Sequence, residues 1–424
     1  MADSTNQSLQ LESGAANPAN GVTFQAETVR VLQRLRTTLA AVVAGIPSSV
    51  SKPAELQRAL KIDMKLSCKI FKVIAASGSM AAGPHVPGGS ALRTFLTAAG
   101  KAGVREPLLA AAAQAAGDFE RLVTSHAGDR DAFDSMICGL ATEDDAVQIT
   151  LQNRRAAFRA QRHIFGLQAR VQVKCMIVQP ANDPRMLDLV QISGYLSLRQ
   201  LRTDTPLMIS RARLTNDDGT VRQVRREPLD PVSDQEAGNA LLREFCSQPL
   251  PEYRTVQSVP GTVCGELVSK GVGKQAAITC LEGHLIRGAV PRYRDETNHV
   301  GANNAKIRIP CEALILDLLV HEDAFGTIQP IGFSCAEHLG EVTNPGACEE
   351  WLRLEPRESV AYLGKGPSVL YSAGFPRHAE LGQYVFDRLG WDAERFDVYR
   401  CRVEYPVLPS TVVMAFELPA APAT

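Results

Sequence analysis

The sequence SKPAELQRALKIDMKLSCKIFKVIA, residues 51–75, decides how the N-terminal part of the chain should fold. Ser51 can cap a first helix, and Pro53 fits the first helical turn, where a missing N–H costs nothing. Asp63 can cap a second helix after a turn of two or three residues. The stretch therefore predicts two short helices joined by a tight turn.

The second helix of this pair has two chemically different faces. One face is apolar and the other is basic. The residues of each face share it because offsets of three and four residues return to nearly the same angle on a helix. The apolar face holds Leu66, Ile70, Val73 and Ile74. The basic face holds Lys65, Lys69 and Lys72. At 100° per residue the centres of the two faces lie roughly 110–120° apart. Leu66 and Ile70 are thus predicted to be core residues, while the lysines remain in solvent.

This stretch resembles the helix-turn-helix of bacterial transcription regulators. The matching apolar positions are Leu56, Leu60, Ile62, Leu66 and Ile70. Two positions depart from the family pattern. Gln57 replaces the usual small residue, and Lys61 replaces the usual turn glycine.

The resemblance implies that the second helix enters the major groove of DNA while the first crosses the backbone. Residues 30–75 carry nine basic residues against Glu55 and Asp63, a net charge of +7 that favours phosphate contacts. The candidate DNA-binding residues are Arg30, Arg34, Lys52, Arg58, Lys65, Ser67, Cys68, Lys69 and Lys72. The alternative is a three-helix bundle whose solvated lysine face serves packing or dimerisation.

The rest of the N-terminal part reads as a tail followed by helices. Residues 1–25 are predicted to be a disordered tail, and residues 26–140 a helical DNA-binding domain. Apolar residues recur at helical spacing from Glu27 onward, and Ser90 is placed to cap a later helix. The first twenty residues lack a basic start and an apolar centre, so we expect no secretory signal.

Residues 141–424 predict a mainly antiparallel α+β domain for ligand sensing or oligomerisation. After a helix that ends at His163 or Phe165, Val171 to Ile177 alternate as in a half-buried strand. Turns are expected at Asp218-Gly219 and Glu282-Gly283, and a late helix at 377–389. Further strands are predicted at 188–198, 206–214, 261–268, 275–289, 306–320, 328–334, 367–372, 396–405 and 411–418. The strand–helix–strand order of a parallel sheet is missing.

Charge is distributed unevenly along the chain. Residues 1–140 have a net charge of +3, residues 141–226 of +6, and residues 227–424 of −10. The helix near 147–165 contributes Arg154, Arg155, Arg159, Arg162 and His163. These cations could contact phosphates, bind an anionic ligand, or pair with the acidic C-terminal region. Arg222, Arg225 and Arg226 are read as a solvated strand face.

Signals for catalysis and metal binding are weak. Cys335 lies close to His338, and Cys280 close to His284, but these pairs are far apart along the chain, so no metal site is expected. The segment from Asp317 to Asp323 could serve general-base chemistry, although a solvated strand end explains it as well. Ten cysteines without a paired framework favour a reducing cytoplasm. No cofactor is predicted.

The sequence therefore predicts a cytoplasmic DNA-binding transcription regulator. Its partners would be duplex DNA, a small-molecule effector and a second copy of the chain, and no membrane. Two alternatives stay open. One is a self-assembling or partner-binding structural protein, and the other is an enzyme with its site in the C-terminal domain.

Overall fold

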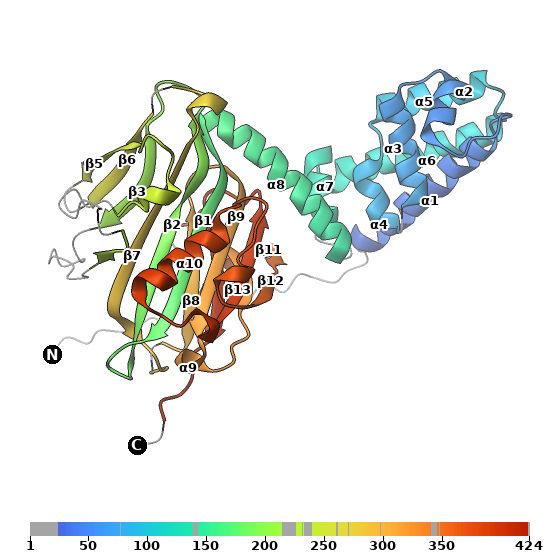
Figure 1. Ribbon diagram of the computed structural model, residues 1–424. Helices are drawn as coiled ribbons and strands as arrows, with labels where there is room; N and C mark the ends of the chain where they lie inside the picture. The colour runs from blue at the N-terminus through green and yellow to red at the C-terminus, as the bar shows by residue number, and fades with distance from the viewer. Residues whose placement is uncertain are drawn as a thin grey trace, which may run out of the picture. The chain divides into compact units, whose positions relative to one another are not determined.

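The computed structural model shows an α+β protein that divides into two compact units, Met1–Ile149 and Thr150–Thr424 (Figure 1). The structure describes residues 24–76, 78–138, 143–213, 226–230, 232, 240–259, 262–269, 271–296, 298–340, 346 and 348–422. Most of the predicted tail, the Asp218-Gly219 turn, Arg222 and Arg225 lie outside these residues. None of the described helices combines the length and the apolar character needed to cross a bilayer.

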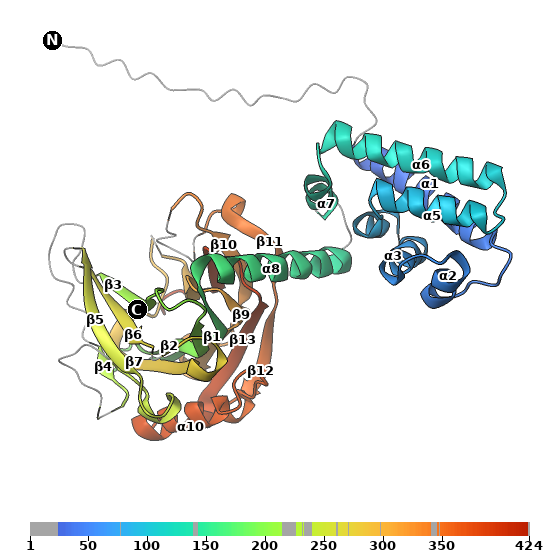
Figure 2. The same cartoon turned by 90° about the horizontal axis from the view of Figure 1, so that it is seen from above.

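The first unit is built from helices alone in its described part. They are α1 (Phe24–Ala44), α2 (Pro53–Leu60), α3 (Met64–Ala75), α4 (Ser79–Ala82), α5 (Gly89–Lys101), α6 (Glu106–His126) and α7 (Arg130–Cys138), with a 3-10 turn at Gly83–His85. The long helices α1 and α6 pack side by side (Figure 2). One core joins them to α3, α5 and α7 through fully buried side chains such as Leu35, Ile70, Phe95 and Phe133.

Two predicted helix starts in this unit are wrong. The Ser51 cap fails because α2 is capped at Lys52, and the Glu55 carboxylate instead accepts N–H bonds from both residues at 2.7 and 3.2 Å. Ser90 lies inside α5, which begins at Gly89. The residue before this helix is Gly88, which has no side chain to cap it, and its carbonyl accepts the Leu92 N–H at 3.0 Å.

Helix α8 (Glu143–Phe165) ends where the sequence predicted, at Phe165. Its residues from Thr150 onward belong to the second unit. There the Phe158 ring packs on Tyr405 at 5.3 Å, and Arg154 pairs with Glu358 at 2.8 Å, with both charged side chains only 9% exposed. This part of α8 is therefore anchored to the C-terminal sheets by apolar and ionic contacts.

The described part of the second unit contains three sheets. The seven-stranded sheet has the order β12-β13-β9-β1-β2-β7-β4, the four-stranded sheet β11-β10-β14-β8, and the three-stranded sheet β3-β6-β5. The strands are β1 (Leu167–Pro180), β2 (Met186–Gln200), β3 (Leu207–Arg213), β4 (Glu227–Pro228), β5 (Glu252–Val259), β6 (Thr262–Val268), β7 (Ile278–Pro291), β8 (Val300–Ile307), β9 (Cys311–His321), β10 (Ile331–Ala336), β11 (Arg353–Glu358), β12 (Val360–Lys365), β13 (Phe396–Glu404) and β14 (Ser410–Glu417). All described pairings are antiparallel except that of β1 with β9.

Strand β1 lies near the middle of the large sheet and is buried on both faces. Val173 and Ile177 contact the core beneath α10 (His378–Leu389), whereas Met176 and Val178 contact the core shared with the four-stranded sheet. The prediction of a half-buried strand is thus wrong. Gln172, polar in sequence, is buried because its Nε2 donates to the Lys306 carbonyl at 2.9 Å.

Other strand predictions also need correction. The run 367–372 forms a 3-10 helix at Pro367–Val369, where Pro367 starts the turn. Glu282-Gly283 lies within β7 and not in a turn, because the two residues pair with Ser193 and Ile192 of β2. The run 306–320 is split into β8 and β9, and β5, β11 and β12 were not predicted. The late helix is confirmed, and it ends at Gly390 with φ of +65°.

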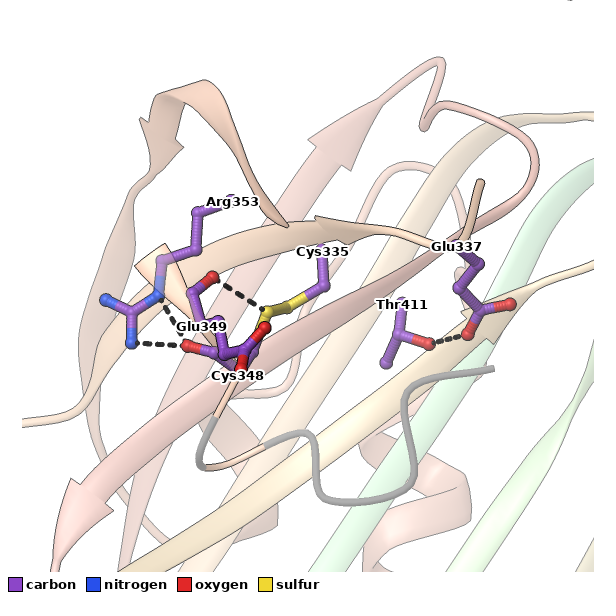
Figure 3. Close-up of a disulfide and its surroundings, with 6 residues drawn as sticks. All are labelled: Cys335, Glu337, Cys348, Glu349, Arg353 and Thr411. Atoms are coloured by element: carbon purple, nitrogen blue, oxygen red, sulfur yellow. Dashed lines mark hydrogen bonds between the residues drawn. A yellow bond between two sulfur atoms is a disulfide. The ribbon is translucent and has the colours of Figure 1, made fainter. Parts of the chain in front are cut away.

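A disulfide joins Cys335 on β10 to Cys348 (Figure 3). Arg353 holds the same segment by donating to the Cys348 carbonyl from Nε at 3.2 Å and from Nη2 at 3.0 Å. Two of the ten cysteines are therefore paired, although the sequence shows no paired framework. Persistent disulfides are typical of oxidising compartments, so the cysteine content gives no support for a reducing cytoplasm. Seven other cysteines are free. Cys68 is partly buried, and the buried ones are Cys175, Cys246, Cys264, Cys280, Cys311 and Cys401.

Candidate nucleic-acid interface

The turn between α2 and α3 contains one residue in the left-handed backbone conformation. Lys61 ends α2 in the left-handed conformation, with φ of 53° and ψ of 40°. Glycine adopts this conformation without steric cost, which explains its place in the family's turn. Here a lysine adopts it. Asp63 then caps α3 as predicted, its carboxylate accepting the Lys65 N–H at 3.0 Å.

The apolar face of α3 is confirmed as part of the core. Ile70 and Val73 are fully buried, and Leu66 is 9% exposed. Leu56 and Ile62 on the other side of the turn are buried as well. Packing of α3 against α1 and of α2 against α5 fixes the rotation of both short helices. Gln57, which replaces the small residue of the family, is only partly buried.

The basic face of α3 is exposed in the structure. Lys65, Lys69 and Lys72 are all exposed, and Cys68 between them is partly buried. Within the part of the chain that is described, no carboxylate forms an ion pair with these three ammonium groups. Ser67 was wrongly assigned to this face. It is fully buried, and its hydroxyl donates to the Asp63 carbonyl at 3.2 Å.

The other predicted cations differ in whether an acidic side chain pairs with them. Arg34 of α1 pairs with Asp118 of α6 at 2.8 Å, and Arg30 lies 3.9 Å from Glu27. Acids outside residues 30–75 thus neutralise part of the predicted charge excess. Arg58 and Lys52 are exposed at the two ends of α2, and the Arg58 Nε donates only to its own helix, at the Ala54 carbonyl.

A basic groove beside the turn was missed by the sequence reasoning. It has a volume of about 840 Å³ and lies between the α2 turn and α5. Its polar lining comes from Lys61, Ser90, Arg93, Thr94, Thr97 and Lys101. The five on α5 recur at three- and four-residue spacing, which is the signal that could have identified this face. Hydroxyl and cationic groups are the side chains that contact DNA phosphates.

A polar row in the second unit is the nearest arrangement to a catalytic site. Strand register places Lys174 of β1 beside Ser193 of β2, and Ser193 beside Glu282 of β7. Burial lowers the pKa of Lys174 to about 8 and raises the pKa of Glu282. Tyr253 from β5 closes the row by bonding to Glu282, and its hydroxyl lies 3.2 Å from that of Ser210. The row is packed between two sheets, and among the described residues no metal-binding group of acids, histidines and cysteines is found.

The segment 317–323 does not form one site. Asp317 is completely buried and accepts from Arg400 Nε and Nη2, both at 2.7 Å, with His378 Nε2 3.2 Å away. His321 instead caps the short helix α9 (Glu322–Phe325) by accepting the Asp323 N–H. Asp317 therefore serves the core, whereas Glu322 and Asp323 form surface ion pairs with Arg395.

Comparison of the chain with protein-family models, with curated proteins and with solved structures finds no match.

Proposed function

We propose that the first unit binds duplex DNA through α2 and α3 and that the protein regulates transcription in the cytoplasm. The observation that carries this proposal is the left-handed Lys61 turn, followed by a helix with one buried face and one exposed lysine face. A left-handed residue ends many helices, so the discriminating feature is the row of three exposed lysines on α3. Such a row favours a helix that is presented to a polyanion over a face used only for packing.

In the proposed mechanism α3 enters the major groove. Lys65, Lys69 and Cys68 face base edges, and Lys72 and the cations of α2 contact phosphates. The groove with Arg93 and Lys101 adds a second row of phosphate contacts. A dimer would match an operator with two half-sites, and the second unit would provide the contact between the two copies.

A salt titration of DNA binding by the full chain tests the proposal. Each phosphate contact contributes about 0.9 to the slope of log affinity against log salt concentration. Replacing Lys65, Lys69 and Lys72 by alanine should flatten this slope and weaken binding to all sequences. Replacing Arg93 and Lys101 tests the groove separately.

The matched control replaces Arg185, Arg211 and Arg254, which are exposed cations of the second unit. It removes the same charge, so its slope should equal that of the wild type if α3 is the interface. Equal slopes for the α3 variant and the wild type would remove α3 from the interface. A full chain that does not bind duplex DNA at low salt would overturn the function itself.

A further inference from the structure

A pocket of about 480 Å³ opens in the second unit, where α8 ends and the large sheet begins. It is lined by Arg159, Arg162, His163, Gln168, Arg199, Leu201 and Gly273. A cavity of this size falls in the range of small-molecule sites, which is about 300–1,000 Å³. Its lining brings together three guanidinium groups and an imidazole with one apolar side chain.

Local structure holds these donors in place. Arg159, Arg162 and His163 occupy one side of the last turns of α8 because they are three and four residues apart. Gly166, with φ of +68°, then reverses the chain into β1, and a Cβ there would meet Arg202 and Thr205 at 2.5 Å. Gln168 of β1 and Arg199 of β2 are direct partners in the sheet register.

The pocket contains buried donors that lack acceptors. Gln168 is 1% exposed, and its Oε1 accepts from Arg162 Nη1 at 3.1 Å while its Nε2 has no partner. The Nε of Arg199 is also buried without a partner, and the carboxylate of Glu312 lies 4.0 Å from the other end of this guanidinium. Buried polar groups in native proteins are nearly always hydrogen-bonded, so unpaired donors beside three cations point to a missing acceptor.

Two neighbouring arginines of α8 are already committed elsewhere. Arg154 forms a salt bridge with Glu358, and the Arg155 guanidinium lies 5.9 Å from the centre of the Tyr405 ring. The predicted arginine face is thus divided into a structural part and a part that lines the pocket. Within the second part, Arg162 also lies 5.7 Å from the centre of the Phe158 ring, on its own helix, while it lines the pocket.

We propose that this pocket binds a small organic polyanion carrying phosphate or carboxylate groups. Planar guanidinium groups match both oxyanions through paired hydrogen bonds, and Gln168 Nε2 would donate a further bond. Leu201 would contact the carbon skeleton of the ligand. The inference does not depend on DNA binding, because the residues lie in the other unit.

Titration calorimetry on the full chain tests this site with three probes: inorganic phosphate, pyrophosphate and citrate. Pyrophosphate and citrate should saturate one site per chain, and their relative affinities separate a preference for phosphate from one for carboxylate. Arg159→Gln should weaken binding on the order of tenfold or more, which is the effect of losing one charge-assisted hydrogen bond. Arg159 is exposed, so this variant should fold, and thermal unfolding checks that it does.

Arg155→Gln is the matched control, since it removes the same charge from the same helix outside the pocket. Its affinity should equal that of the wild type. Equal weakening in both variants would mean that binding reflects the general positive charge of α8. Absence of saturable binding by all three probes at millimolar concentration would also overturn the proposal.

Discussion

Replacing Ile70 by alanine tests the rotation of α3, on which the assignment of its lysine face depends. Ile70 is completely buried in the core of the first unit. The substitution removes three carbon atoms, and at about 0.8 kcal/mol for each buried CH₂ the lost transfer energy is about 2.4 kcal/mol. A residual cavity adds to this, so we expect a total loss of roughly 2–5 kcal/mol. Lys69→Ala, one residue away on the exposed face, should change stability by less than about 0.5 kcal/mol.

The chain provides a separate probe for each unit. Both tryptophans, Trp351 and Trp391, lie in the second unit, so their fluorescence follows that unit alone. Far-UV circular dichroism is dominated by the helices, most of which belong to the first unit. In a denaturant titration of the full chain, Ile70→Ala should shift the helical transition to lower denaturant and leave the tryptophan transition in place.

The opposite order of effects would refute the assignment. If Lys69→Ala destabilised the helical transition more than Ile70→Ala, α3 would be rotated and its lysines would belong to the core. If Ile70→Ala shifted both transitions equally, the two units would unfold as one, against the separate cores seen here.

Three further predictions concern the turn and the second core. Lys61→Gly should be more stable than Lys61→Ala by about 0.5–1 kcal/mol. The left-handed backbone costs a residue with a side chain about 1–2 kcal/mol, and the greater conformational entropy of unfolded glycine offsets part of this difference. Denaturant melts in which the Lys61→Ala variant is as stable as Lys61→Gly would count against a strained turn. Burial lowers the pKa of His378 to about 4, so as pH falls below about 6.5 this side chain is protonated in the unfolded chain before it is protonated in the folded one. The free energy of unfolding of the second unit should therefore decrease by up to about 3 kcal/mol by pH 4. His378→Gln should remove this part of the pH dependence in melts followed by tryptophan fluorescence. Arg400→Met should destabilise the second unit by about 3–5 kcal/mol, because it leaves Asp317 charged and buried without its partner. In the same melts, adding Asp317→Asn should recover most of that loss. A double variant as unstable as Arg400→Met alone would refute this explanation.

Local sequence predicted the helices better than the sheet. The helical spacing of apolar residues after Glu27, the Asp63 cap and the late helix at 377–389 each depend on residues a few positions apart, so they could be predicted directly. Burial of β1 on both faces depends on α10 and on β14, which lie more than 190 residues later in the chain. No local pattern contains that information, and the strand was therefore taken as half-buried.

In the candidate sites, too, the local sequence predicted the helical parts and not the parts that depend on the sheet. The lysine face of α3 follows from helical spacing, and only Ser67 was assigned to the wrong side. The anion pocket joins the end of α8 to Arg199 of β2 and Gly273 of a later loop, and the sequence could indicate only the members on α8, which are Arg159, Arg162 and His163. The row of Lys174 and Glu282 depends on strand register, which the sequence does not specify.

The parallel pairing of β1 with β9 has a consequence for the order of events during synthesis. The contacts that hold the helical unit together are largely complete once residue 138 has left the ribosome, and helical units with many local contacts form quickly. Strand β1 emerges soon afterwards, but its parallel neighbour follows about 140 residues later, and β13 later still. At roughly 5–20 residues per second, the apolar edge of β1 therefore waits for several seconds without its partner. This nascent strand is the part of the molecule where we expect chaperones to act.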